Sequence, residues 1–342
     1  MINPVIFTIR LFGYEYPIYW YGLIVMTGVL VGSMIVERSL KRRGEDSEKF
    51  WDALIWVVLF GILGARLWYI VNATLGGNRI YIENPAELIN LRQGGLHIFG
   101  GFLFGSIVLL WYIRKNKLDP WLYLDMAGPG LLIGQAIGRL GNFINQELYG
   151  PPTTLPWGIH ITMDNRLPQF RDLPETTRFH PTFAYEMIWN ILAASFLLWL
   201  SRRYEKQLKP GTLFAGWLIL AGIGRAWIEL FRPDQPKIPE LGISYSAIVA
   251  ALMAVTGAVI LMIRYKGISV AFAEEWEEEY KITPPAAPQP VMEADEIVEV
   301  VEPVAPTPKR KPAVRKTKSA PAKKAKTKAK TAKRKPKKST AK

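Results

Sequence analysis

Hydrophobic residues along this chain fall in long blocks, not in alternating or helical stripes. The first block, residues 18–36, runs for 19 residues without a charge, close to the roughly 20 residues that a helix needs to cross a bilayer. Similar blocks recur along the chain. We therefore predict an all-α integral membrane protein with seven transmembrane helices. The predicted spans cover residues 18–36, 51–71, 96–113, 122–140, 183–200, 213–230 and 243–263.

Lys and Arg in the connections between these spans predict the orientation of the chain, because basic residues near span ends stay in the cytoplasm. The connections after the first, third and fifth spans are rich in Lys and Arg, whereas those after the second and sixth contain two each. We expect the N-terminus outside and the C-terminus in the cytoplasm. The long, proline-rich connection at 141–182 then forms a small outer cap between spans four and five.

The net charge of +14 is a property of one end of the chain. Residues 303–342 hold 17 of the 43 Lys and Arg and none of the 29 Asp and Glu. Such a segment cannot bury a core, so we expect it to be disordered. We predict a seven-span domain at 1–270, an acidic helix with a Pro-rich linker at 271–302, and the basic tail at 303–342. The tail is expected to bind anionic lipid or nucleic acid.

Ionisable side chains inside membrane spans are costly and usually line a cavity, so each is a candidate functional residue. In six of the seven predicted spans, such residues or other polar ones lie near the outer face, which predicts a site in the outer leaflet. The set comprises Tyr21, Arg66, Gly100, Gly101, His180, Arg225, Glu229 and Arg232, together with the end of the fourth span. Arg66 could equally be paired with a nearby carboxylate, and the glycines at 100 and 101 could simply allow close helix packing.

Residues 138–150 (GRLGNFINQELYG) form the densest polar run of the chain. Glycines let the backbone approach a ligand closely, and Arg139 can bind phosphate bidentately. Asn142, Asn145 and Glu147 can hydrogen-bond hydroxyl groups or hold the arginine. The run therefore predicts an anionic, hydroxyl-bearing lipid headgroup at the outer surface, with its acyl chains in grooves between the spans.

The absence of cysteine excludes disulfides, thiolate metal sites and a cysteine nucleophile. We expect neither a metal nor another cofactor. A transporter or channel for an anionic substrate is the main alternative. It needs polar residues through both halves of the membrane, and the cytoplasmic halves of the predicted spans are nearly uncharged. An intramembrane protease is disfavoured because the chain has no G-x-S-x-G and no H-E-x-x-H element.

At these residues the chain resembles the bacterial prolipoprotein diacylglyceryl transferases. The run at 138–150 is similar to the most specific motif of that family, and the resemblance covers about residues 1–265. The other matching segments lie at 19–22, 64–66, 94–101, 180–186 and 224–234. The acidic segment and the basic tail lie outside the resemblance.

The resemblance implies transfer of a diacylglyceryl group from phosphatidylglycerol to the lipobox cysteine thiol of a prolipoprotein, with release of glycerol phosphate. It places the protein in the bacterial cytoplasmic membrane, with the site toward the outer leaflet. The expected partners are phosphatidylglycerol, other membrane lipids and the prolipoprotein signal peptide. Arg139, Arg225 and His180 become candidate catalytic residues. The candidate substrate-binding residues are Tyr21, Arg66, Gly100, Gly101, Asn142, Asn145, Glu147, Gly150, Glu229 and Arg232.

The implied reaction must stabilise a leaving phosphate and ionise a thiol, whose ordinary pKa of about 8.5 leaves it mostly protonated at neutral pH. Arginine favours both negative charges, so we assign Arg139 to phosphate binding and Arg225 to the transition state, or the reverse. The general base stays open. Many members of the family carry His where this chain has Phe99, and His180 is either another candidate or a residue that holds the cap.

Overall fold

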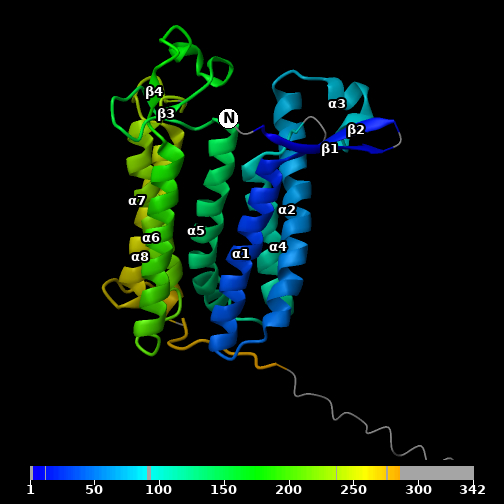
Figure 1. The fold of residues 1–342 in the computed structure, drawn as a ribbon. Coiled ribbons are helices and arrows are strands. Elements are labelled where there is room, and N and C mark those ends of the chain that lie inside the picture. The colour runs from blue at the N-terminus through cyan, green and yellow to red at the C-terminus, as the bar shows by residue number, and fades with distance from the viewer. Residues whose placement is uncertain (1–2, 12, 91–93, 236, 275, 286–342) are drawn as a thin grey trace, which may run out of the picture. The chain divides into compact units, whose positions relative to one another are not determined.

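The computed structural model describes residues 3–11, 13–90, 94–235, 237–274 and 276–285, all within one compact unit, Met1–Ala287 (Figure 1). The basic tail at 303–342 and most of the predicted linker lie outside these residues. Seven long helices make up most of the described part. They are α1 (Trp20–Arg42), α2 (Ser47–Leu75), α4 (Ile98–Lys115), α5 (Pro120–Asn145), α6 (Thr182–Arg203), α7 (Thr212–Ile228) and α8 (Tyr245–Arg264).

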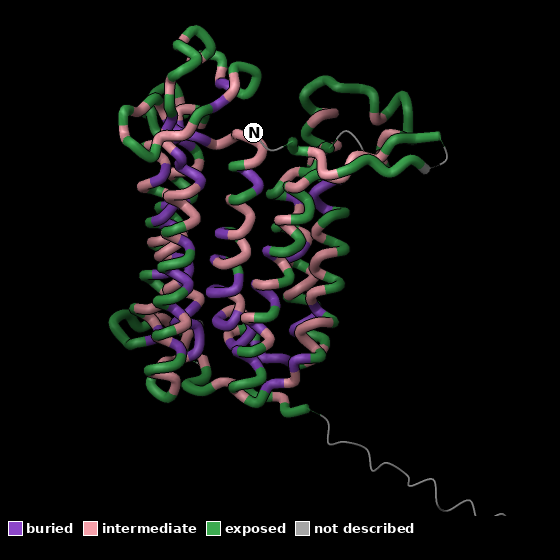
Figure 2. The backbone as a smooth tube through the Cα atoms, viewed as in Figure 1, coloured by how far each residue is buried: buried purple, intermediate pink, exposed green. Residues whose placement is uncertain are grey.

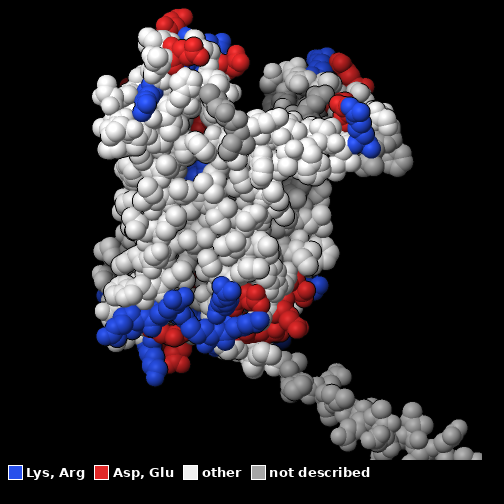
Figure 3. Space-filling view, in the orientation of Figure 1, with Lys and Arg blue, Asp and Glu red and all other residues white. Residues whose placement is uncertain are grey.

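The helix bundle has two ends that differ in their connections. We call the end that carries the N-terminal strands and the short helix α3 (Ile80–Glu83) the upper end, as in Figure 1, and the end where α1 leads into α2 the lower end. Charged side chains gather at both ends, and the face between them is almost free of charge (Figure 3). Along the helices, apolar side chains such as Ile55, Leu192 and Leu252 are more than 60% exposed (Figure 2). An exposed apolar belt of this kind marks a surface that faces lipid.

Among the residues that the structure describes, six helices are long and apolar enough to cross a membrane, namely all the long ones except α5. Helix α5 occupies the predicted fourth span and has 26 residues, but it contains Asp125, Pro129 and Arg139. It packs against α1, α6 and α7, so its polar positions can face protein. The prediction of a helical membrane protein is confirmed in this coarser form, and the seventh span stays a prediction.

Glycines set the close packing of α5 against α1. A Cβ atom on Gly32 would lie 2.6 Å from the carbonyl oxygen of Gly130, and one on Gly28 would lie 2.8 Å from that of Gly134. Any larger side chain would push the two helices apart. Small residues of this kind let helices approach each other in membranes, where apolar surfaces alone give little driving force.

Two small antiparallel sheets depart from the all-α prediction. They are formed by β1 (Val5–Leu11) with β2 (Tyr14–Tyr19), and by β3 (Ile159–His160) with β4 (Arg178–Phe179). The first helix therefore begins at Trp20 and not at residue 18, because Ile18 and Tyr19 pair with Phe7 and Val5 in the first sheet. Because Ile18 and Tyr19 are apolar, the sequence analysis counted the end of this hairpin as part of the first hydrophobic block.

The connection between α5 and α6, predicted as the cap, is built around a buried arginine. Arg166 is 2% exposed. Its guanidinium group donates hydrogen bonds to the carbonyl oxygens of Ile161, Leu173, Pro174 and Glu175. Because Ile161 is distant in sequence from the consecutive residues 173–175, this side chain joins two separate parts of the connection.

The acidic segment after α8 is not the helix that we predicted. Apart from a short 3-10 turn at Ala271–Ala273, the described residues beyond 270 are irregular, and residues 276–285 contain no helical turn. In a helix, Glu274 and Glu278 would lie one turn apart and repel each other. The segment instead crosses the lower end of the bundle, and we call residues 276–283 the strap.

Three acidic side chains hold the strap in place. The bonds run from Tyr280 Oη to Asp125 (2.6 Å), from Lys281 N to Asp119 (2.9 Å) and from Thr283 N to Glu45 (2.7 Å). Asp125, Asp119 and Glu45 are all at most 6% exposed. The strap therefore completes the hydrogen bonding of carboxylates that would otherwise meet water at the end of the bundle.

Candidate active site

The end of α5 builds one half of a polar network at the upper end. Arg139 Nη1 donates to Asn142 Oδ1 (3.0 Å), and Nη2 pairs with Glu186 of α6. Asn142, which is 4% exposed, donates to Glu147 Oε1 (2.7 Å), and Asn145 donates to the same oxygen (3.3 Å). The structure thus brings four predicted residues of the 138–150 run into one network with Glu186.

The turn that ends α5 explains this convergence. Gln146 takes the left-handed conformation (φ 54°) directly after the helix. The chain then folds back, so that the Glu147 amide donates to the Asn142 carbonyl (3.0 Å). Gln146 Oε1 also accepts a bond from the Thr162 amide (2.8 Å). Hydrogen bonds therefore join the last turn of α5 to Glu147, which follows it, and to Thr162 in the connection between α5 and α6.

A second arginine lies at the end of α7. Arg225 Nη2 is 3.1 Å from Glu229 Oε2, one turn farther along, in the 3-10 turn Glu229–Phe231. Ser246, in the first turn of α8, donates to the same carboxylate oxygen (2.7 Å). The charges of Arg139 and Glu186 act on Arg225, so the two arginine–carboxylate pairs form a single electrostatic cluster.

Both arginines keep hydrogen-bonding capacity. Among the described residues, Arg139 makes two side-chain bonds with its five N–H groups, and its buried Nε makes none. Arg225 makes the ion pair with Glu229 and no further side-chain bond within this part of the chain. The side chains are 22% and 24% exposed. Each can therefore bind an anionic ligand with the remaining edge of its guanidinium group.

Arg232, another predicted residue, is closely paired. It is 6% exposed and donates two bonds of 2.8 Å to the carboxylate of Asp234. Burial alone would raise the pKa of the Asp234 carboxyl, but the two bonds and the positive charge of Arg232 outweigh it and lower that pKa below its ordinary value. Asp234 therefore stays ionised and fixes Arg232 beside the cluster.

Arg66, another predicted residue, binds the connection between α2 and α4. It is 8% exposed, and its five N–H groups all donate to backbone carbonyl oxygens. These acceptors are Glu87, Leu88, Asn90, Gly94 and Gly95, in the connection between α2 and α4. All five donors are thus engaged within the protein, and the predicted binding role stays a prediction. The partners are carbonyls, and not the carboxylate that we considered as the alternative.

The predicted glycines fall into two groups. A Cβ atom on Gly100 would lie 2.3 Å from the carbonyl oxygen of Gly64, and one on Gly101 would lie 3.3 Å from that of Gly61. These two residues therefore allow α4 to pack closely on α2. This agrees with the alternative considered above, that the glycines at 100 and 101 serve helix packing. Gly150 is different, because a Cβ atom there would meet His180 at 2.8 Å and the Phe231 carbonyl at 3.0 Å. It lets the chain pass between α6 and α7 beside the cluster.

Tyr21 lies next to the 138–150 run. Its ring packs on the backbone of Gly141, where an added Cβ atom would lie 2.7 Å from it. The side chain is 40% exposed and belongs to the first turn of α1. A phenol beside Asn142, open on one side, is in a position to contact the same ligand.

His180 anchors the start of α6. Its Nδ1 lies 3.1 Å from Tyr185 Oη, which accepts a bond from Trp157 Nε1 (2.8 Å). The imidazole also contacts the ring of Phe231. The histidine therefore links the connection above the bundle, α6 and the end of α7. These contacts fit the holding role, and they leave its Nε2 without a hydrogen bond among the described residues.

An apolar groove opens beside the Arg139–Glu186 pair. It has a volume of about 520 Å³ and lies between α5 and α6, under the connection that joins them. Leu140 and Tyr185, which line it, are sequence neighbours of the two charged residues. The other lining residues are Phe143, Trp157, Ile159, Pro181, Phe183, Ala184, Met187 and Ile188. A groove of this kind can hold a hydrocarbon chain whose polar end reaches the arginine.

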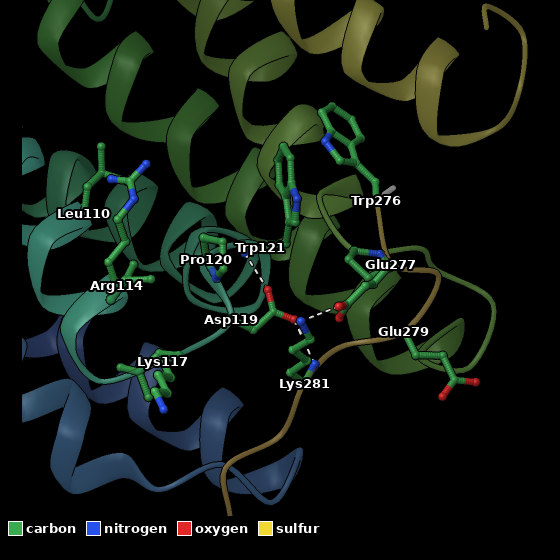
Figure 4. Close-up of a pocket in the computed structure, with 13 residues that line it drawn as sticks. Leu110, Arg114, Lys117, Asp119, Pro120, Trp121, Trp276, Glu277, Glu279 and Lys281 are labelled. Atoms are coloured by element: carbon green, nitrogen blue, oxygen red, sulfur yellow. Dashed lines mark hydrogen bonds and ion pairs between the residues drawn. The ribbon is translucent and has the colours of Figure 1, made fainter. Parts of the chain in front are cut away.

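A second cavity, of about 430 Å³, lies at the lower end between α4, α5 and the strap (Figure 4). Two of its carboxylates are already engaged: Asp119 caps α5 and accepts from the strap, and Glu277 pairs with Lys281. This cavity therefore belongs to the structural network of the strap. Within the described residues, no three His, Asp or Glu side chains are placed to hold a metal ion.

Sequence reasoning missed several residues of the cluster. Ser246 lies in the last predicted span, which contributed nothing to the expected site, and Trp157 lies in the connection above the bundle. Neither has a neighbouring motif that points to its role. Asp234 and Glu186 stand inside the segments that carried the family resemblance, which was the available signal for them.

Comparison with known proteins identifies the family of the chain. The family model described as prolipoprotein diacylglyceryl transferase matches residues 4–263. Relatives named phosphatidylglycerol–prolipoprotein diacylglyceryl transferase include one from Chloroflexus aggregans, 38% identical over 68% of this chain and 78% of its own length. Another, from Leifsonia xyli, is 39% identical over 71% and 74%. A third, from Enterococcus faecalis, is 33% identical over 82% and 98%.

Proposed function

From the premise that the chain belongs to the prolipoprotein diacylglyceryl transferase family, we propose that the cluster at the upper end is its active site. The chain is a multi-pass membrane transferase that moves a diacylglyceryl group from phosphatidylglycerol to prolipoprotein. The transporter alternative has no support. The observation that carries the assignment is the pair of partly buried arginines, each held by one carboxylate and each with an unoccupied edge.

The acceptor is the thiol of the lipobox cysteine in the prolipoprotein signal peptide. Its sulfur attacks the glyceryl carbon that bears the phosphate, so a C–S bond forms as the C–O bond breaks. The electron pair leaves on the phosphate oxygen, and the thiol proton ends on the released glycerol phosphate, directly or through a base. Negative charge therefore moves from sulfur to phosphate during the reaction, and the enzyme must stabilise it throughout.

Arg139 binds the phosphate, and Arg225 stabilises the charge that develops on it. Two fixed guanidinium groups need no reorganisation as the charge moves, which is the main source of catalysis in such sites. They also favour the thiolate form of the incoming cysteine. Asn142, Asn145 and Glu147 orient the glycerol hydroxyls of the headgroup, and Tyr21 contacts the phosphate or the ester region. Glu186 and Glu229 keep the two arginines in place.

One acyl chain of phosphatidylglycerol occupies the apolar groove between α5 and α6. The groove is lined by aromatic and aliphatic side chains, and two of them, Leu140 and Tyr185, are sequence neighbours of Arg139 and Glu186. A lipid placed there has its phosphate at the arginines and its hydrocarbon among apolar residues. Gly150 and Arg232 shape the neighbouring backbone, and His180 holds the connection above the groove in position.

The upper end faces outward from the bacterial cytoplasmic membrane, and the lower end faces the cytoplasm. Seven helices then span the membrane, with α5 surrounded by its neighbours. The N-terminal hairpin and the connection above α5 lie outside, where an exported prolipoprotein meets the outer leaflet. The strap and the basic tail lie inside, where the tail meets anionic lipid or nucleic acid.

The cysteine-free chain allows a direct test of this orientation. Thr176→Cys places a thiol on an exposed position of the upper end, and Lys206→Cys places one on an exposed position of the lower end. In intact cells, a membrane-impermeant maleimide should label the first and not the second. Labelling of Lys206→Cys without permeabilisation would contradict the orientation.

The chemistry is tested with the purified protein in nanodiscs, phosphatidylglycerol labelled in its acyl chains and a peptide with a lipobox cysteine. We expect equal amounts of diacylglyceryl thioether and glycerol phosphate, and no product with the matched serine peptide. Near-normal turnover by both Arg139→Ala and Arg225→Ala would sink the assigned roles while leaving the family activity in place.

A further inference from the structure

Helix α8 contributes a side chain to the site that the mechanism above does not use. Ser246 stands in the first turn of α8, and its hydroxyl group lies 2.7 Å from Glu229 Oε2. That oxygen is also the atom paired with Arg225 (3.1 Å). The hydroxyl therefore reaches the catalytic arginine through one intervening carboxylate.

The direction of the hydrogen bonds around Ser246 is fixed by chemistry. Ser246 Oγ lies near two acceptors, Glu229 Oε2 (2.7 Å) and Gln235 Oε1 (3.2 Å), and we assign its single proton to the shorter bond with the ionised carboxylate. Ser244 Oγ, 3.1 Å away, is then the donor to Ser246, and it accepts in turn from the Ala247 amide (3.0 Å). The chain runs from the start of α8 to the arginine in one consistent direction, and each bond polarises the next.

Glu229 depends on this hydroxyl. Its side chain is 12% exposed, and its other oxygen, Oε1, is buried without a hydrogen-bond partner among the described residues. Glu229 Oε2 is thus the oxygen with polar partners, and these partners are the side chains of Ser246 and Arg225. Without the hydroxyl, the carboxylate is free to rotate about its last bond, and the guanidinium group loses its fixed partner.

We propose that Ser246 is a positioning residue, which holds Glu229 so that the free edge of Arg225 stays directed at the leaving phosphate. The proposal rests on the assignment of Arg225 in the proposed function. It makes the start of α8 part of the catalytic unit, although Ser246 touches neither substrate. A small displacement of a catalytic group costs rate without preventing substrate from binding.

The test is steady-state transfer by purified variants in nanodiscs, with phosphatidylglycerol and the lipobox peptide. Ser246→Ala should lower kcat about tenfold, the scale expected for one hydrogen bond to a charged group, and change KM for the lipid by less than about twofold. Ser246→Thr, which restores the hydroxyl, should recover most of the rate. Ser39→Ala is the matched control, because it removes a buried hydroxyl bonded only to its own helix, at Ile35 O (2.8 Å).

A double-mutant cycle separates positioning from a general loss of structure. Glu229→Gln should itself reduce kcat, and adding Ser246→Ala to it should cost less than about twofold more, because the two residues act as one unit. Full additivity, or a kcat for Ser246→Ala equal to that of Ser39→Ala, would overturn the proposal. A normal rate for Arg225→Ala would instead defeat the assignment on which it rests.

Discussion

The two ends of the helix bundle both bury charged side chains, but they complete the hydrogen bonds of those charges differently. At the lower end, Asp125 is fully buried and accepts three bonds of 2.6 Å, from the amides of Gly211 and Phe214 and from the hydroxyl of Tyr280. At the upper end, Arg139 and Arg225 have one carboxylate each and retain donors. A saturated charge holds a structure together, whereas an unsaturated one next to a groove is ready for a ligand.

The same contrast separates arginines within the upper end. The guanidinium groups of Arg66 and Arg166 donate hydrogen bonds to backbone carbonyl oxygens of the connections around them. Sequence alone did not separate Arg66 from Arg139, because both are arginines near the end of a predicted span, and it gave no role to Arg166. The number of donors already in use is what tells structural arginines from catalytic ones.

The largest expected effect is on catalysis at the upper end. Arg139→Ala should reduce transfer by at least about a hundredfold, as expected when a preorganised donor to a developing charge is removed. The thermal unfolding temperature should change little, since Arg139 is not part of the helix packing. Arg202→Ala, an exposed arginine of the lower end, should leave the rate unchanged. A large fall in both variants would contradict the contrast between the ends.

Next comes stability at the lower end. Asp125→Ala should leave two amides at the start of α7 without their acceptor and cost about 2–4 kcal/mol of unfolding free energy. The kcat of the folded fraction should match that of the unaltered protein. Thermal unfolding together with active-site titration measures both quantities. A selective loss of kcat with normal stability would place Asp125 in the catalytic machinery instead.

Tyr280→Phe probes the strap alone. It removes one of the three bonds to Asp125 and keeps the aromatic ring, which lies 4.7 Å from the guanidinium carbon of Arg43. The expected cost is about 1 kcal/mol, smaller than for Asp125→Ala and again without effect on kcat. An unchanged unfolding temperature would show that the strap adds nothing to the stability of the bundle.

Two carboxyls at opposite ends should respond to pH in opposite directions. The lowered pKa of Asp234 means that its stabilising contribution is present above its ordinary value of about 3.9 and is lost as pH falls through the lowered value. Burial of Glu45 raises its pKa, against the bonds from Thr283 and Tyr123, so its contribution is lost as pH rises.

The measurement is the difference in unfolding temperature between the unaltered protein and each amide variant. Between about pH 3 and pH 6, the advantage over Asp234→Asn should grow with pH, and the advantage over Glu45→Gln should shrink. These changes are expected to be the smallest of the series. Parallel trends for the two variants would contradict the opposite environments of the two groups.

Much of the fold followed from hydrophobic block length, which placed each long helix within a few residues of its position. The exceptions have local causes. Ile18 and Tyr19 are apolar enough to read as membrane span, yet they pair with β1. The strap reads as an acidic helix, because its partners Asp119, Asp125 and Glu45 lie more than 150 residues earlier in the chain.

The candidate site was predictable where residues are close in sequence. The 138–150 run covers the end of α5 and the residues directly after it. Arg139, Asn142 and Glu147 are therefore close in sequence and lie in one hydrogen-bond network. Ser246 and Trp157 could not be found this way, because their roles come from helices and connections that meet only in the folded chain. Arg66 was predicted to bind substrate from its place in a span, and sequence does not reveal that all five of its donors are engaged with backbone carbonyls.

The strap also decides where this enzyme can be cut or fused. The family match stops at residue 263, and a boundary drawn there would discard Tyr280, Lys281 and Thr283 along with the tail. Three acidic groups at the lower end would then lose a donor each. The unit that can be moved between proteins therefore extends to about residue 285. A reporter or affinity tag joined after that point follows a segment that is bonded to the bundle, and it lies at the opposite end from the candidate site.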